Sequence, residues 1–252
     1  MSKVKTNLSA RKKPVVYSDF EAAKLEILAA TQRGPFYGVL TGSSGTGKTS
    51  LLREVAAALD RHRFQVHYLA HSKTSTAGIG RFLAEVLHLS QRRSHTETLR
   101  AMAQALRALP FRILLFVDEA NLLGAETLQE IRLLAESELD SPPLFTVLFS
   151  GLPEFKQKLE APALFPLRRR ISLRLELNGL KKDELLPFLA LRIGENQAAR
   201  LPGEAIAAIF ERARGVPALV ESLATRCLES VSEQEFISMG KVTEVLESWE
   251  LS

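Results

Sequence analysis

The sequence predicts an α/β fold in which helices cover a mainly parallel sheet. Short apolar runs of β type alternate with helical patterns, as strands and crossover helices do in parallel sheets. After residue 177 the strand patterns end and only helical patterns continue, which indicates a second, all-helical part. A chain of 252 residues is long enough for one α/β domain and a small second one.

Five apolar runs are expected to form strands, and they lie at residues 36–41, 64–70, 112–117, 144–150 and 171–177. Helices are expected to fill most of the gaps, beginning with 19–32, where Leu25 and Leu28 share one face. A segment of small polar residues at 71–78 is typical of a loop, and a helix is expected after it at 79–89. The helices expected after the sheet lie at 183–193, 204–213, 218–230 and 242–249.

The octapeptide GSSGTGKT runs from Gly42 to Thr49 and fits the pattern G-x-x-x-x-G-K-[ST] at every fixed position. An apolar run precedes it and a helical pattern follows, which is the strand–loop–helix context that a phosphate-binding loop requires. The alternative is a glycine-rich turn that matches by chance, but such a turn does not account for both flanking patterns. The expected nucleotide-binding residues are Gly42, Ser43, Ser44, Gly45, Thr46, Gly47, Lys48, Thr49 and Ser50.

The fixed residues of this loop have distinct chemical roles. Its three glycines let successive backbone N–H groups turn toward the phosphates, at the positive end of the following helix. Lys48 is expected to reach the β- and γ-phosphates of ATP, and the Thr49 hydroxyl is expected to ligate Mg²⁺.

A second motif, ILLFVDE at 113–119, joins a fully apolar strand to two adjacent carboxylates. A strand of this kind suits the centre of a parallel sheet, and ligands of open α/β folds bind at its carboxyl end. Asp118 is expected to hold Mg²⁺ opposite Thr49, and Glu119 to orient and deprotonate the attacking water. The alternative is a strand that runs into an acidic turn. Together with the upstream loop, the motif favours hydrolysis over simple binding.

Composition and charge limit the class of protein. No apolar stretch approaches the roughly 20 residues that span a bilayer, and no apolar segment typical of a signal peptide follows the first lysines. A single cysteine, Cys227, excludes internal disulfides and is typical of a reducing compartment. We therefore expect a cytoplasmic protein without a membrane span.

The net charge of +4 is unevenly distributed. Five basic residues precede the first acidic residue, Asp19, and they are Lys3, Lys5, Arg11, Lys12 and Lys13. Such an arm either follows a nucleic-acid backbone, lies against another anionic surface or is a solvated tail. An isoelectric point of about 9.3 agrees with an anionic partner but does not identify it.

The motifs resemble those of the AAA+ ATPases, and within them the group of ExeA-type secretion ATPases and TnsC, TniB and MuB type transposition regulators. The resemblance covers most of the chain and rests on GSSGTGKT, DEANLL, SGLPEF, LRRRI and GVPALV, which begin at residues 42, 118, 150, 167 and 215. It implies a three-layer P-loop nucleotide domain at 18–177 and a small all-helical lid domain at 178–252. The basic arm at 1–17 precedes both.

The same resemblance implies further site residues. Ser150 is expected to act as sensor 1, although it is equally well explained as a hydroxyl that closes a strand-end turn. Arg168 and Arg170 match the spacing of an arginine finger that enters a neighbouring subunit's site, which implies a homo-oligomeric ring or filament. The alternative for these arginines is a solvated basic cluster or a DNA contact. Ala218 stands where relatives carry the sensor 2 arginine, so slower hydrolysis is expected.

Three functions fit these features. The first is an ATPase that binds duplex DNA without sequence preference and regulates transposition, with a transposase or another element-encoded protein as its partner. The second is an ATPase of secretion-apparatus or envelope assembly, which we expect to fit less well because secretion relatives usually continue into a membrane span. The third is a nucleotide-gated switch with little turnover, for which the missing arginine argues.

Overall fold

The computed structural model describes residues 16–69, 76–87, 89, 95–136, 142–232 and 237–249. The basic arm expected at 1–17 lies outside this range except for its last two residues, and so does most of the loop expected at 71–78. The chain forms two compact units. The first contains Lys24–Thr41 and Leu52–Glu176, and the second contains Gly42–Leu51, Leu177–Ser252 and the described end of Ser9–Ala23.

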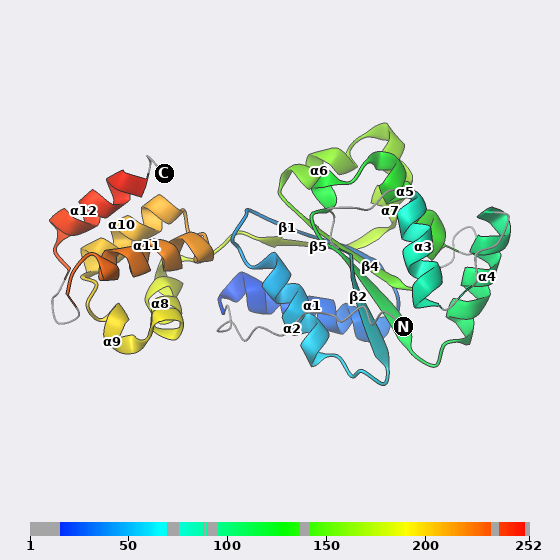
Figure 1. Ribbon diagram of the computed structural model, residues 1–252, viewed down its shortest axis with the longest axis horizontal. Helices are drawn as coiled ribbons and strands as arrows, with labels where there is room; N and C mark the ends of the chain where they lie inside the picture. Colours follow the sequence, from blue (N-terminus) through cyan, green and yellow to red (C-terminus); the bar gives the residue numbers. More distant parts are fainter. Residues whose placement is uncertain are drawn as a thin grey trace. The chain divides into compact units, whose positions relative to one another are not determined.

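A five-stranded sheet forms the centre of the first unit, with the strand order β2-β3-β4-β1-β5 (Figure 1). The strands are β1 (Tyr37–Gly42), β2 (Phe64–Leu69), β3 (Arg112–Val117), β4 (Thr146–Gly151) and β5 (Ile171–Leu177). β2, β3, β4 and β1 pair in parallel. Ser172 Oγ donates to the Tyr37 carbonyl at 3.5 Å and Thr41 Oγ1 to the Leu175 carbonyl at 3.4 Å, so β5 runs in the same direction as β1. The expected fold class is confirmed.

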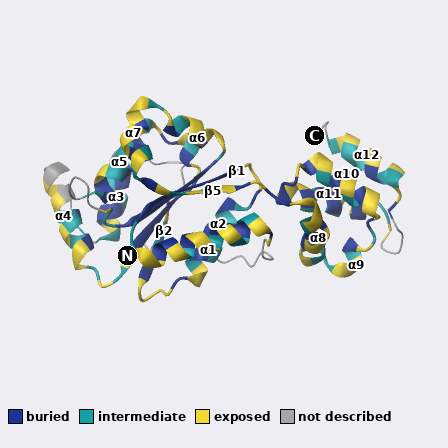
Figure 2. Cartoon of the chain, turned by 180° about the vertical axis from the view of Figure 1, so that it is seen from behind, coloured by how far each residue is buried: buried dark blue, intermediate teal, exposed yellow. Residues whose placement is uncertain are grey.

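The burial of each strand explains its place in this order. Every residue of β1 and β4 is buried, and β3 exposes only Arg112, because helices cover both faces of the central strands. In β5 only the two end residues are buried, and exposed and half-buried residues alternate between them. The interior of β2 is also accessible, as expected for strands at the two edges of the sheet. Figure 2 shows the central strands as the buried layer of this unit.

Helices pack on both faces of the sheet and complete three layers (Figure 1). α1 (Ser18–Arg33) and α2 (Lys48–Ala58) cover one face. The other face carries α3 (Thr76–Val86), α4 (His95–Ala108), α5 (Ala125–Ala135), α6 (Glu154–Leu159) and α7 (Phe165–Arg170). Alternate residues of β3, namely Ile113, Leu115 and Val117, enter the core on the side of these five helices.

The leading helix buries a different side from the one that its leucines indicated. In α1 the buried hydrophobic residues are Phe20, Ala23, Ile27 and Ala30, whereas Leu25 is 65% exposed. Its buried residues recur every three to four positions, so the helical period holds but Leu25 lies off the packed face.

The region after the sheet is helical, as expected. Its helices are the short 3₁₀ helix η4 (Lys182–Glu184) and α8 (Leu185–Ile193), α9 (Glu195–Ala198), α10 (Gly203–Ala213), α11 (Pro217–Glu229) and α12 (Met239–Ser248). Pro187 is tolerated because it lies in the first turn of α8. The single turn α9 was not expected, since four residues are too few to show a period. In the described part of the chain, no helix is long and apolar enough to cross a membrane.

Candidate functional site

The GSSGTGKT segment forms a tight loop between β1 and α2. Gly42 is the last residue of β1, and α2 begins at Lys48. Gly45 and Gly47 have φ angles of +86° and +97°, which residues with a side chain rarely adopt. The Thr46 hydroxyl donates to the Ser43 carbonyl at 2.9 Å and closes the turn. The backbone N–H groups at the start of α2 have no helical partner, so this helix presents its positive end to the loop.

The Lys48 side chain is directed into the loop rather than into solvent. Lys48 is only 7% exposed. Its ammonium donates to the carbonyl oxygens of Gly42 at 2.7 Å and Ser43 at 3.0 Å. Thr49 is the second residue of α2 and is half-buried. A cation and a hydroxyl thus stand together at the positive end of a helix.

The second unit packs helix α11 directly against this loop. The Ala218 N–H donates to the Gly45 carbonyl at 3.2 Å. A Cβ built on Gly45 would lie 3.0 Å from both the Ala218 Cβ and the Val216 Cγ1. Ala218 stands at the position where the resemblance implied a sensor 2 arginine. A small residue at 218 thus lies where the helix approaches the loop backbone closely.

Tyr17 holds the loop from another side, and no motif pointed to it. Its hydroxyl donates to the Thr46 carbonyl at 2.8 Å, and the residue is 3% exposed. Burial raises the pKa of this hydroxyl, and the nearby carboxylates Asp19 and Glu184 raise it further. Tyr17 therefore stays a neutral donor, and the loop carbonyl keeps its hydrogen bond.

The two carboxylates after β3 have different environments. Asp118 is 4% exposed, and two donors fix its oxygens: the Tyr68 hydroxyl at 2.5 Å from Oδ2 and the Glu119 N–H at 3.0 Å from Oδ1. Burial, and next the hydrogen bond to Asp118, raise the pKa of Tyr68, so this hydroxyl remains a donor. Tyr68 lies on β2, and its contact with Asp118 was not expected from the sequence.

Glu119 is exposed and its backbone is strained. Its φ and ψ angles are 52° and 37°, in the left-handed region. A non-glycine residue there costs about 1–2 kcal/mol, and such strain concentrates at functional sites. The turn separates the accessible Glu119 carboxylate from the buried, fixed carboxylate of Asp118.

Ser150 lies at the carboxyl end of β4, and its surroundings differ from those of an ordinary turn hydroxyl. The residue is fully buried, and its Oγ has no hydrogen-bond partner in the structure. The turn that follows is held instead by Asn121 of the DEANLL segment, whose Oδ1 accepts the Leu152 N–H at 3.1 Å. Lys158 Nζ donates to the Asn121 carbonyl at 2.7 Å. Asn121 thus ties the segment after β3 to the turn after β4.

The pairing of β3, β4 and β1 brings their ends to one edge of the sheet. Val117 lies beside Phe149, and Thr41 lies beside Gly151. The carboxylates, Ser150 and the strand that leads into the loop therefore share the carboxyl edge. Ligands of open parallel sheets bind at this edge.

Arg168 and Arg170 lie at the opposite, amino edge, directly before β5. Arg168 pairs with Glu160, a carboxylate whose side chain is 67% exposed, and its guanidinium lies 5.5 Å from the centre of the Phe165 ring. The Nε of Arg170 lies 3.0 Å from Oε1 of Glu136, a carboxylate that is only 11% exposed. The two arginines are equivalent in the sequence, but one pairs with an exposed carboxylate and the other with a buried one.

A parallel three-layer sheet with a glycine-rich loop, a buried lysine and carboxylates at the strand ends defines a P-loop nucleoside triphosphatase. A model of the AAA domain family matches residues 32–159. That span is half of the chain, and the chain therefore belongs to the AAA family of ATPases.

General secretion pathway protein A of Aeromonas hydrophila is 26% identical over 205 residues. The match covers 78% of this chain but 37% of that protein, so the chain spans little more than a third of its relative.

Solved structures with the same fold include proteins of Pyrobaculum aerophilum and Aeropyrum pernix. Cdc6p of Pyrobaculum aerophilum has a TM-score of 0.65 at 17% identity, with 96% of this chain and 70% of that chain covered. The ORC2 protein of Aeropyrum pernix, in ADPNP and ADP complexes, has a TM-score of 0.64 at 15% identity and coverages of 95% and 70%. The ORC1 protein of Aeropyrum pernix, in complex with DNA, has a TM-score of 0.62 at 18% identity and coverages of 96% and 68%.

The close packing at Gly45 leads to a stability prediction. Gly45→Ala introduces a Cβ at a positive φ and against α11, so we expect the free energy of unfolding to fall by about 1–2 kcal/mol in urea denaturation. Gly80→Ala is the matched control, because Gly80 lies inside α3 and a Cβ there meets nothing within 4 Å. That variant should gain up to about 1 kcal/mol. Equal stabilities of the two variants would contradict the packing.

Proposed function

We propose that this chain binds ATP with Mg²⁺, hydrolyses it in an oligomer and uses the cycle to control a complex on duplex DNA. The observation that carries the ATPase proposal is the buried Lys48 ammonium inside a glycine-rich loop. This loop follows β1, which pairs with β4, the strand that contains Ser150.

The residues fit a magnesium nucleotide. The Lys48 ammonium, which meets loop carbonyls in this structure, has the donors that phosphate oxygens require. The Thr49 hydroxyl and the Asp118 carboxylate are hard oxygen ligands of the kind that Mg²⁺ prefers. The Ser150 Oγ is a buried group without a hydrogen-bond partner among the described residues. When bound, Mg²⁺ neutralises phosphate charge.

Each residue then has a separate task in hydrolysis. Tyr68 and the Glu119 N–H hold the Asp118 carboxylate in one orientation, ready to ligate. The exposed Glu119 carboxylate accepts the proton of the attacking water. Ser150 positions that water or the γ-phosphate as sensor 1, and Asn121 holds the turn after Ser150. Ala218 leaves the sensor 2 position without a guanidinium, so we expect turnover to be slow.

The positions of Arg168 and Arg170 support an arginine finger that acts on a neighbouring subunit's nucleotide. Arg168 and Arg170 lie at the amino edge of their own sheet, whereas the carboxylates lie at the carboxyl edge, so these arginines suit a neighbouring chain's nucleotide. Of the two, Arg168 is the better finger because its partner Glu160 is exposed and easily replaced. Arg170 is held by the buried Glu136, where breaking an ion pair is costly.

Duplex DNA is the partner that the charge favours. The basic arm and the isoelectric point of about 9.3 suit a sequence-independent contact with phosphates. The ORC1 protein with the same fold was solved in complex with DNA. We propose that the ATP-bound chain forms a ring or filament on DNA and recruits a transposase or another protein of the same element.

Secretion-apparatus assembly is the second candidate. It is favoured by the 26% identity to General secretion pathway protein A. In this alternative the same nucleotide site drives the assembly of an envelope complex, and duplex DNA has no effect on turnover.

The base assignment can be tested by Glu119→Gln, which keeps the shape of the side chain but removes its basicity. We expect ATP affinity close to that of the wild type and turnover reduced by about a hundredfold or more, measured by fluorescent-nucleotide binding and phosphate release. Lys48→Ala is the paired variant, and it should lose binding as well as turnover. Normal turnover of Glu119→Gln would remove Glu119 from the mechanism.

The trans arrangement predicts complementation between two inactive variants. Arg168→Ala binds ATP but lacks the finger, so its turnover should fall about a thousandfold. Lys48→Ala lacks ATP but still offers Arg168, and mixing the two should restore part of the activity. An Arg61→Ala variant, at an exposed turn before β2, controls for loss of positive charge. A mixture as inactive as its components rules out the trans arrangement.

DNA binding by the arm predicts a change in salt dependence. Deletion of residues 1–13 removes five basic residues, so DNA affinity should fall and the slope of log affinity against log salt should flatten by about 0.9 for each lost phosphate contact. Fluorescence anisotropy with a duplex across a salt series measures both quantities. An unchanged slope assigns the arm to the solvated-tail alternative, and no duplex binding by the full chain favours the secretion candidate.

A further inference from the structure

An open basin of about 700 Å³ lies at the amino edge of the sheet, on the side opposite to the carboxylates. Its walls come from the segments that lead into β1 and β4, from α5, and from α7 with the start of β5. They include Phe36, Arg132, Phe165, Arg169 and Arg170. All of these residues belong to the first unit. Of the described residues that line the basin, only Arg170 has a place in the nucleotide proposal, and Arg168, the better finger, does not line it.

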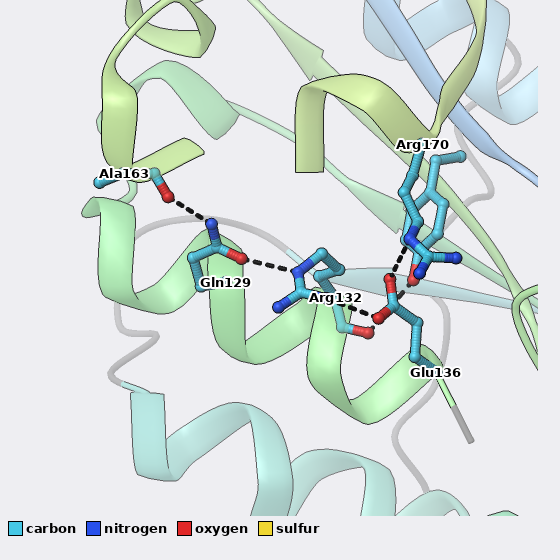
Figure 3. Close-up of polar contacts among 6 residues, drawn as sticks. Gln129, Arg132, Glu136, Ala163 and Arg170 are labelled. Carbon is cyan, nitrogen blue, oxygen red and sulfur yellow. Dashed lines mark hydrogen bonds and ion pairs between the residues drawn. The ribbon is translucent and has the colours of Figure 1, made fainter. Parts of the chain in front are cut away.

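Among the described residues of the basin, positive charges outnumber negative ones. Three of the described residues that line it are charged, and all three are arginines: Arg132, Arg169 and Arg170. The carboxylate beside them, Glu136, meets Arg132 Nη1 through Oε2 at 2.5 Å and Arg170 Nε through Oε1 at 3.0 Å (Figure 3). Among the described residues of the basin, one carboxylate stands against three guanidinium groups, and this described lining suits an anionic ligand.

Two of these guanidinium groups are held in place before any ligand arrives. Arg132 Nε donates to the Gln129 side chain at 2.7 Å, and the Gln129 amide is held in turn by the Ala163 carbonyl (Figure 3). The Tyr37 hydroxyl donates to the Arg132 carbonyl at 3.2 Å. Side chains fixed in this way lose little conformational entropy on binding, so the network favours affinity.

The rim of the basin has the composition of a protein–protein contact. Phe165 is 48% exposed, and the Arg169 guanidinium lies 5.7 Å from the centre of its ring. Proline residues 35, 142, 143 and 166 form rigid walls around it. Aromatic residues and arginine are enriched at the energetically dominant positions of protein interfaces.

The shape of the basin distinguishes between kinds of anion. Small-molecule sites bury most of their ligand, whereas Pro142, Phe165, Arg169 and Ser172 leave this basin open to solvent. Duplex DNA presents its phosphates on a broad convex surface, and the Arg132 side chain, only 16% exposed, lies below the rim. A protruding carboxylate on a partner protein can reach Arg132 and Arg170 while its apolar neighbour covers Phe165.

We propose that the amino-edge basin binds an acidic segment of a partner protein, in which a glutamate or aspartate lies beside an apolar side chain. Arg132 and Arg170 receive the carboxylate, and Arg169 with Phe165 forms the contact at the rim. The site goes beyond the ATPase proposal and does not depend on it, because docking requires no nucleotide.

The test uses a fluorescein-labelled peptide in which glutamates alternate with leucine and phenylalanine, titrated by anisotropy into the full-length chain without nucleotide. The control peptide has glutamines in place of the glutamates. We expect the acidic peptide to bind more tightly, and Arg169→Glu and Phe165→Ala each to weaken it about tenfold or more. Arg61→Glu makes the same charge change at the exposed turn before β2, which is the outermost strand on the side away from β5. This variant should leave the affinity within about twofold.

Three outcomes overturn the proposal. The first is equal affinity for the acidic and the amide peptide, and the second is an equal loss in Arg169→Glu and Arg61→Glu, which would indicate general attraction to a basic protein. The third is displacement of the peptide by duplex DNA or free ATP that Arg169→Glu abolishes, because the basin would then bind phosphate. Circular dichroism of each variant checks that the fold is intact.

Discussion

The parallel pairing of β3, β4 and β1 is the constraint on which the rest of the structure depends. Because Val117 lies beside Phe149 and Thr41 beside Gly151, backbone hydrogen bonds fix the ends of these strands at one edge. Their interiors are apolar and buried, so polar groups can occur only where the strands end. The loop, the two carboxylates and Ser150 follow directly from these three ends. Of the two outermost strands, β2 contributes Tyr68, and β5 follows directly after Arg168 and Arg170.

Backbone strain and close packing both occur where strands end. Glu119 is held in the left-handed region, and Gly45 packs so tightly against Val216 and Ala218 that a Cβ would have to displace them. Ordinary core packing holds apolar side chains, whereas each of these features fixes a polar side chain or a backbone group. At Ala218, where the resemblance to AAA+ proteins implied an arginine, α11 contacts the loop through its backbone N–H.

The sequence was most informative where a local pattern determines the structure. Central strands appear as continuous apolar runs, and GSSGTGKT specifies its own turn, so the fold class and the loop geometry could be predicted. Contacts between distant segments could not. Tyr17 and Tyr68 are 29 and 50 residues from the partners that their hydroxyls reach, and no motif marks them. The same limit applies to Arg168 and Arg170, since only the structure distinguishes an exposed Glu160 from a buried Glu136. The proposed roles of the site residues, predicted from the motifs, stay predictions.

The two edges of the sheet suggest a division of tasks, with nucleotide chemistry at the carboxyl edge and partner contacts at the amino edge. The central claim is that the carboxyl edge binds ATP together with Mg²⁺. It is tested most directly by titrating the purified chain with a fluorescent ATP analogue, in the presence of Mg²⁺ and again with the metal chelated. The account predicts saturable binding that weakens markedly on chelation and is displaced by unlabelled ATP. Binding of equal strength with and without Mg²⁺, or binding that ATP does not displace, would contradict it.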